Sequence, residues 1–129
     1  MADKRVIRTD KAAGPMGGAP YSQAIVTGEL VFVAGQLGLE PDGSGFAGES
    51  IEAQTEQIMR SLGAILEAAG SGLEKLVKTS VFLTDLADFQ AMNAVYAQHV
   101  GSAPPARSTF QVAALPAGAL VEIEAVAHL

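Results

Sequence analysis

Two stretches of this chain carry apolar residues at helical spacing. Across residues 50–69 the apolar positions recur three and four residues apart while the charged positions fall on other faces, which predicts an amphipathic helix. Ser50 is suited to cap the first turn of this helix, and Gly70 is suited to end it. Residues 86–100 repeat the pattern, so we expect a second helix there, capped by the preceding threonine or aspartate.

Six shorter segments are rich in β-branched and apolar residues, which is typical of strands. We expect the strands near Val6–Arg8, Ser22–Thr27, Leu30–Gln36, Leu76–Leu83, Ser108–Val112 and Val121–Ala127. Gly28 and Glu29 predict a hairpin turn between the second strand and the third. Because residues 30–34 are apolar without a break, both faces of the third strand should be covered. Alternation in the fourth strand places Val77 on the same face as Thr79.

The predicted elements follow the order β-β-β-α-β-α-β-β, and neither a repeat nor a linker divides them. We therefore expect residues 1–129 to form a single domain of the α+β class, in which both helices pack on one face of a mixed sheet. The opposite face then carries more apolar surface than a monomer leaves exposed. For that reason we expect this face to meet another subunit in a homo-oligomer.

Composition and charge remove several kinds of function. The chain has no cysteine, which excludes disulfides, thiolate metal sites and cysteine nucleophiles. Its two histidines, His99 and His128, lie far apart, so we expect no metal site. Fourteen acidic and eight basic residues give a net charge of −6, which does not favour binding to nucleic acid. No apolar run approaches the ~20 residues of a membrane span, and we expect a cytoplasmic protein.

The first candidate for chemistry is Arg107, which follows Pro104 and Pro105. The proline pair holds the backbone extended and leads the arginine into the start of a strand. An arginine on rigid backbone is suited to bind a carboxylate through two parallel hydrogen bonds. The alternative, left open by the spacing alone, is a solvated arginine at the end of a strand.

A second candidate is the pair Glu122 and Glu124. Alternation places both side chains on one face of the last strand, opposite Val121 and Ile123. A glutamate near Arg107 would serve as a proton shuttle or orient a water molecule. The pattern fits equally well with a solvent-facing edge that carries two acids.

The third candidate joins Tyr21 with Gly35. The tyrosine hydroxyl can form a hydrogen bond with a ligand oxygen, and glycine lets a ligand approach its backbone amide. Structurally, these two residues would be no more than part of a turn and the end of a strand.

Taken together, these segments resemble the RidA (YjgF) family from about Pro20 to Ala127, in order and with few gaps. The segments that carry the resemblance are Tyr21-Ser22-Gln23-Ala24, Gly35-Gln36, Ile65–Gly70, Val77–Leu83, Asp88-Phe89, Met92-Asn93, Pro105-Ala106-Arg107-Ser108 and Val121–Ala127. The resemblance implies a chorismate-mutase-like α+β fold that assembles as a homotrimer, with clefts between the subunits.

The resemblance also implies an activity: hydrolysis of enamine or imine intermediates, such as 2-iminobutanoate and 2-iminopropanoate, to the 2-oxo acid and ammonia without a cofactor. By this analogy Arg107 binds the substrate carboxylate, and Glu122 handles the water and the imine nitrogen. Tyr21, the Gly35 amide and the backbone around Thr109 would line the pocket. Archetypal deaminases of the family carry a serine at the position of Ala34, so this pocket is expected to lack one hydroxyl group.

Four functions remain open at this point. The leading one is an imine deaminase, and the second is a module that binds a 2-oxo acid in the same cleft without turnover. Glu122 separates these two, because catalysis needs it and carboxylate binding does not. An endoribonuclease is disfavoured by the net charge of −6. A chaperone-like role through exposed apolar surface is the fourth.

Overall fold

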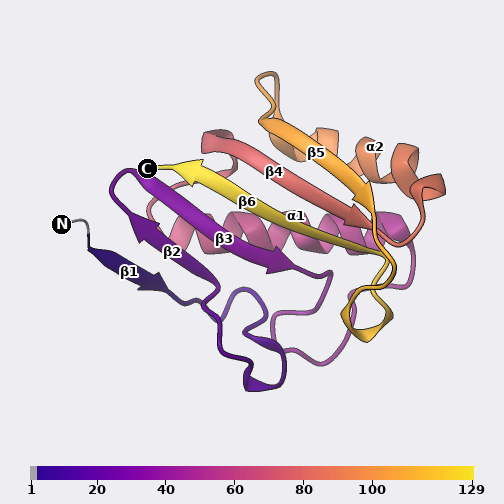
Figure 1. Cartoon of the computed structure of the whole chain (residues 1–129), viewed down its shortest axis with the longest axis horizontal. Coiled ribbons are helices and arrows are strands. Elements are labelled where there is room, and N and C mark those ends of the chain that lie inside the picture. The colour runs from indigo at the N-terminus through magenta and orange to yellow at the C-terminus, as the bar shows by residue number, and fades with distance from the viewer. Residues whose placement is uncertain (1–2) are drawn as a thin grey trace.

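The computed structural model describes residues 3–129, which fold into six strands, two α-helices and four short 3-10 turns (Figure 1). The strands are β1 (Lys4–Ile7), β2 (Ala24–Thr27), β3 (Leu30–Gln36), β4 (Leu76–Leu83), β5 (Ala106–Gln111) and β6 (Val121–His128). The helices are α1 (Ile51–Ala68) and α2 (Phe89–Val100). The 3-10 turns are η1 (Met16–Gly18), η2 (Leu73–Lys75), η3 (Leu86–Asp88) and η4 (Pro116–Gly118).

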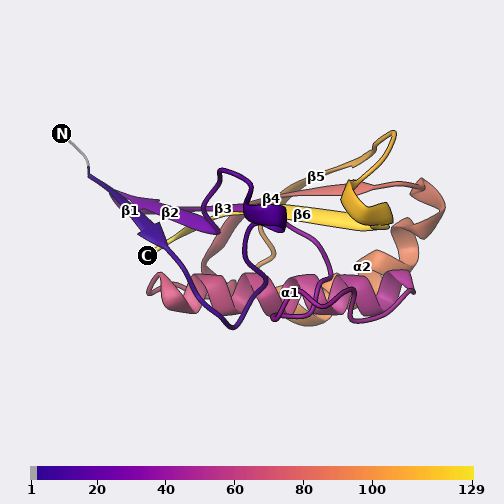
Figure 2. The ribbon, with the colours of Figure 1, turned by 90° about the horizontal axis from the view of Figure 1, so that it is seen from below.

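All six strands belong to one sheet, in the order β1-β2-β3-β6-β4-β5. Strands β4 and β5 are parallel and every other pair is antiparallel, so the sheet is mixed as predicted. Both helices cover one face of the sheet and leave the other open, as Figure 2 shows. The predicted α+β class is therefore confirmed, with β1 and β5 as the two edge strands.

The two helices begin and end close to where their sequence patterns predict. Helix α1 starts after Ser50, whose hydroxyl oxygen accepts a hydrogen bond from the Ala53 amide at 3.0 Å. Gly70 follows the helix with a φ of 87°, a left-handed conformation that suits glycine. The second helix begins three residues later than predicted, because residues 86–88 form the 3-10 turn η3, where Asp85 accepts from the Ala87 amide.

One prediction about the face of a strand is wrong. Val77 does not share a face with Thr79, because the register shifts between Leu76 and Lys78; Leu76 is 7% exposed and Val77 is 46% exposed. Such a bulge adds one residue to a strand and reverses the alternation on one side of it. The expected cover on both faces of β3 stays a prediction, since only a second subunit could cover the open face, where Phe32 is 43% exposed in the single chain.

The core lies between the sheet and the helices. It is built from apolar side chains, with Ile58, Leu62 and Ile65 of α1 fully buried against strand residues such as Val31 and Ile123. On the opposite face, large apolar side chains such as Phe32 and Phe110 lie exposed. No helix within residues 3–129 is long and apolar enough to cross a membrane.

Candidate active site

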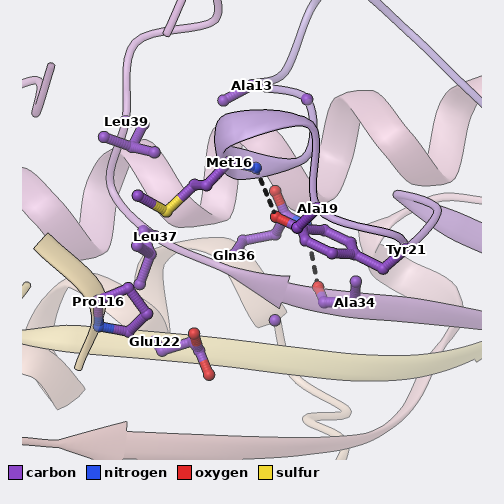
Figure 3. A pocket seen from close by; sticks show the side chains of 12 residues that line it. Ala13, Met16, Ala19, Tyr21, Ala34, Gln36, Leu37, Leu39, Pro116 and Glu122 are labelled. Atoms are coloured by element: carbon purple, nitrogen blue, oxygen red, sulfur yellow. Dashed lines mark hydrogen bonds between the residues drawn. The ribbon is translucent and has the colours of Figure 1, made fainter. Parts of the chain in front are cut away.

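A cavity of about 410 Å³ opens where β3 ends and β6 begins, beside the loop that precedes β2 (Figure 3). Its walls come from that loop, from β3 and the residues after it, from η4 and from β6. The lining residues are Ala13, Gly14, Met16, Ala19, Tyr21, Ala34, Gly35, Gln36, Leu37, Leu39, Pro116 and Glu122. Most of them are apolar or glycine, and Glu122 is the one ionisable acid in this lining.

Glu122 reaches the cavity because of its place in β6. Its neighbours Val121 and Ile123 are fully buried under the helices, so alternation turns Glu122 to the open face. Burial raises the pKa of the Glu122 carboxyl above its usual value, and the nearby Glu124 carboxylate raises this pKa further. Within residues 3–129 the Glu122 carboxyl accepts no hydrogen bond, which leaves its oxygens available to a ligand or water.

Gly35 makes room for that carboxyl. A Cβ atom at position 35 would lie 2.8 Å from Glu122 Cδ and 2.9 Å from Glu122 Oε2, closer than side-chain atoms approach. The pairing of β3 with β6 is irregular here, with a register shift between Val33 and Gln36. Glycine at 35 therefore permits the conformation of Glu122, a role that its sequence context did not reveal.

Tyr21 supplies a polar group to an otherwise apolar wall. Its hydroxyl oxygen accepts a hydrogen bond from the Met16 amide at 3.1 Å, so the hydroxyl proton remains free to be donated to a ligand. The residue that lines the cavity beside Gly35 is Ala34, whose methyl group offers no hydrogen bond. Tyr21 thus holds the one hydroxyl among the lining side chains.

Gln23 positions this wall of the cavity, a role that its local sequence pattern does not predict. Its side chain is buried; the amide nitrogen donates to the Thr9, Ala12 and Ala13 carbonyls at 3.0–3.2 Å. Its carbonyl oxygen accepts from the Thr9 amide at 2.7 Å. The loop that brings Ala13 to the cavity is therefore tied to the start of β2. The only signal in the sequence was the place of Gln23 in Tyr21–Ala24, a segment that carries the family resemblance.

Arg107 and Thr109 lie elsewhere. In β5, Arg107 is beside Thr79 of β4 and Thr109 is beside Val81, and both of these β4 residues are fully buried on the helix side of the sheet. The Arg107 guanidinium accordingly stacks on α2, with its Cζ 4.9 Å from the ring centroid of Tyr96. The structure brings Tyr21, Gly35 and Glu122 together and leaves the other two predicted site residues on the opposite face.

The cavity therefore combines three chemical properties. A carboxyl with a raised pKa can take a proton from water and give it up again, which is what general acid–base catalysis requires. A phenol can donate a hydrogen bond, and apolar walls limit the water around a small ligand. Among residues 3–129 no three acidic or histidine side chains gather in a way that could hold a metal ion.

Fold and cavity together define a small α+β protein with a half-buried carboxyl of raised pKa on the open face of its sheet. Comparison with known proteins identifies the family of the chain. The family model described as Endoribonuclease L-PSP matches residues 12–129. The chain belongs to this family, that of the RidA (YjgF) proteins, which confirms the resemblance found in the sequence.

Similar proteins support the assignment along nearly the whole chain. Reactive Intermediate Deaminase A, chloroplastic, of Arabidopsis thaliana is 49% identical over 126 residues; the match covers 98% of this chain and 66% of that protein. The 2-iminobutanoate/2-iminopropanoate deaminase of Homo sapiens is 42% identical, with 96% of this chain and 89% of the human protein covered. The crystal structure of RidA from an Antarctic Psychrobacter superposes with a TM-score of 0.92 at 43% identity, over 97% of this chain and 99% of that one.

Proposed function

We propose that this protein hydrolyses the imines of small 2-amino acids, of the 2-iminobutanoate and 2-iminopropanoate class, to the 2-oxo acid and ammonia. The observation that carries the proposal is the Glu122 carboxyl, which has a raised pKa and lies in a mostly apolar cavity beside Gly35 and Tyr21. The human relative is named for the same reaction.

The reaction needs one water molecule, and both of its protons end on the nitrogen. Glu122 as carboxylate takes a proton from water while the oxygen attacks the carbon of the C=N bond, and it returns that proton to the nitrogen, which gives a carbinolamine. Glu122 then takes the proton of the carbinolamine hydroxyl and passes it to the nitrogen, so that the C–N bond breaks and ammonia leaves as the C=O bond forms. Tyr21 is suited to donate a hydrogen bond to the oxygen or nitrogen of the reacting group.

The substrate carboxylate needs a cation that the cavity of one chain does not hold. In a single subunit the sheet separates Arg107 from Glu122, since they face opposite sides of it. We therefore assign carboxylate binding to Arg107 of a second copy of the chain, with the backbone around its Thr109 beside it. This arrangement fits a homotrimer of single-domain subunits in which the open apolar faces meet.

Nucleic acid is not among the partners that we propose. The family model carries the description of an endoribonuclease, but the net charge of −6 opposes the approach of a phosphate backbone. The expected cytoplasmic location stays a prediction, since the Arabidopsis relative is named as chloroplastic. Imaging of the tagged protein in its own cells would determine the location.

One observation favours a second candidate, a module that binds a 2-oxo acid without turnover. Ala34 gives the cavity a methyl group where archetypal deaminases of the family have a hydroxyl, which removes a polar contact from the site. This candidate uses the same cleft and the same Arg107, but it does not require Glu122.

The test is to generate 2-iminobutanoate in situ with an amino-acid oxidase and to trap it with semicarbazide. Wild type should suppress trapping, whereas Arg107→Ala and Glu122→Ala should lose that effect. If wild type fails beside an active control deaminase but still binds 2-oxobutanoate, the binding module replaces the enzyme. If Glu122→Ala keeps full activity, the assigned mechanism is wrong.

A further inference from the structure

Arg107 is held by aromatic rings instead of by an acid. Its Cζ lies 5.6 Å from the ring centroid of Phe89 and 4.9 Å from that of Tyr96. These residues are seven positions apart on α2, about two turns, so their rings lie on one face of the helix. Across residues 3–129, no carboxylate forms an ion pair with Arg107 and no side chain accepts a hydrogen bond from it.

Tyr96 is itself held in place by a contact with the sheet. Its ring is buried, and its hydroxyl shares a hydrogen bond of 2.7 Å with Thr79 Oγ1, which is fully buried in β4. Thr79 is also the neighbour of Arg107 in the β4–β5 pairing. Each of Thr79, Tyr96 and Arg107 therefore contacts the other two, and these contacts fix the positions of β4, α2 and β5 relative to one another.

A second tether keeps α2 in place against β5. The side-chain oxygen of Gln111, at the end of β5, accepts a hydrogen bond from the Leu86 amide at 2.9 Å. Leu86 begins the 3-10 turn that leads directly into α2 at Phe89. The strand that carries Arg107 and the helix that carries both rings are thus joined near the first of the two rings.

The way in which a guanidinium is held decides what it can still bind. A guanidinium that lies over an aromatic ring is attracted by the π face of the ring, and this contact leaves its N–H donors free for another partner. A carboxylate partner within the chain would occupy those donors and would compete with the carboxylate of a substrate. Two rings orient Arg107 without that competition.

We propose that Phe89 and Tyr96 are positioning residues that orient Arg107 for a ligand carboxylate, and that the Thr79–Tyr96 hydrogen bond sets the position of the Tyr96 ring. The proposal rests on the proposed function, in which Arg107 binds the substrate carboxylate. It predicts that damage to the rings weakens the binding of carboxylate ligands and leaves the chemical step at Glu122 intact.

The experiment measures KM and kcat for 2-iminobutanoate, together with the Kd of 2-oxobutanoate, in full-length variants. Phe89→Leu and Tyr96→Leu each remove one ring and should raise KM and Kd roughly tenfold with little change in kcat. Tyr96→Phe keeps the ring, so it should recover most of the loss seen in Tyr96→Leu. Phe89 is only partly buried, so its variant tests the proposal even if Tyr96→Leu does not fold.

The hydrogen bond has its own test. Thr79→Val and Tyr96→Phe each remove one hydroxyl of the pair and should raise the Kd by roughly two- to threefold. The double variant should bind no worse than either single one, because the same bond is lost in all three. Gln98→Ala is the control, since this exposed side chain lies on α2 and takes no part in the contacts that position Arg107.

The possible outcomes separate the two proposals. Unchanged KM and Kd in Phe89→Leu and Tyr96→Leu, in an active protein that needs Arg107, overturn the positioning role alone. A fall in kcat without a change in KM or Kd also overturns it. A wild type that neither hydrolyses 2-iminobutanoate nor binds 2-oxobutanoate overturns the proposed function, and the positioning role with it.

Discussion

Glu122 occupies space that is open only because position 35 has no side chain. The added Cβ of Gly35→Ala would lie 2.8 Å from Glu122 Cδ, and the flexible carboxyl end would have to move. We expect the variant to fold and to lose activity on the order of tenfold or more, since displacement of a catalytic group by about 1 Å is costly. Steady-state kinetics and thermal unfolding measure the two effects separately.

Gly14 provides a matched control for this substitution. It lines the same cavity, but a Cβ there meets no atom within 4 Å. Gly14→Ala should therefore keep wild-type activity. If both variants lose activity equally, the cavity tolerates no added carbon atom at either position. The contact between positions 35 and 122 would then not be the cause of the loss in Gly35→Ala.

The pKa of Glu122 predicts a pH dependence. Burial and then the charge of Glu124 raise this pKa above the usual value of a glutamate carboxyl, and the proposed base must be deprotonated. The kcat/KM should therefore fall as the pH decreases, with a midpoint above the usual pKa of a glutamate carboxyl. Glu124→Gln should move this midpoint down, because it removes one cause of the shift while leaving burial, the larger cause, in place. Rate profiles of both proteins against pH are the measurement, and an unmoved midpoint would contradict the coupling.

The same shift has a cost in stability. A carboxyl whose pKa is higher in the folded chain than in the unfolded chain favours folding below the unfolded pKa and opposes it as the pH rises through the folded pKa. Glu122→Gln should therefore raise the melting temperature at pH 7, and the gain should shrink as the pH approaches 4.5 or below. A melting temperature that falls at pH 7 would show that the charged carboxylate stabilises the fold instead.

At the scale of elements, the Ser50 cap of α1 should make a measurable contribution to the free energy of unfolding. Ser50→Ala removes the hydrogen bond from the Ala53 amide and should lower the free energy of unfolding by about 1 kcal/mol. Ser102→Ala, in an exposed turn after α2, should change it far less. Urea denaturation of the two variants measures this free energy. An equal decrease in both would mean that the Ser50 cap does not stabilise the fold specifically.

Elements were predictable where one period runs through them without interruption. Helix α1 has a cap, a continuous stripe and a terminating glycine, so its ends agree with the prediction within about one residue. Strand β4 has a bulge at Val77, and the sequence there offers no glycine or proline to mark it. The start of helix α2 was predicted three residues too early. The reason is that the apolar and polar positions of the 3-10 turn at 86–88 resemble those of the first turn of a helix.

At the scale of the whole molecule, the open face and the divided site lead to one prediction. Arg107→Ala keeps Glu122, and Glu122→Ala keeps Arg107, so each inactive variant holds the half of the site that the other lacks. If two copies share each site, the two variants unfolded together and refolded as a mixture should recover activity. Random assembly of equal amounts should restore about a quarter of the sites.

Two controls make this mixture informative. Each variant refolded alone should stay inactive, and the mixture should have the same molar mass by light scattering as the wild type. A correctly assembled mixture without activity would mean that Arg107 and Glu122 do not serve one shared site, and carboxylate binding would have to be assigned to another residue.

By itself the sequence determined the two helices, the α+β class, the family and the face of β6 on which Glu122 lies. It could do so because the period of a helix or strand fixes how each side chain points relative to its own element. Only the tertiary structure decided that Arg107 stacks on α2 across the sheet from Glu122, that Gly35 makes room for the carboxyl, and that Val77 faces outward. These facts depend on strand order, on bulges and on which elements pack together, and long-range contacts of that kind leave no periodic trace in a single sequence.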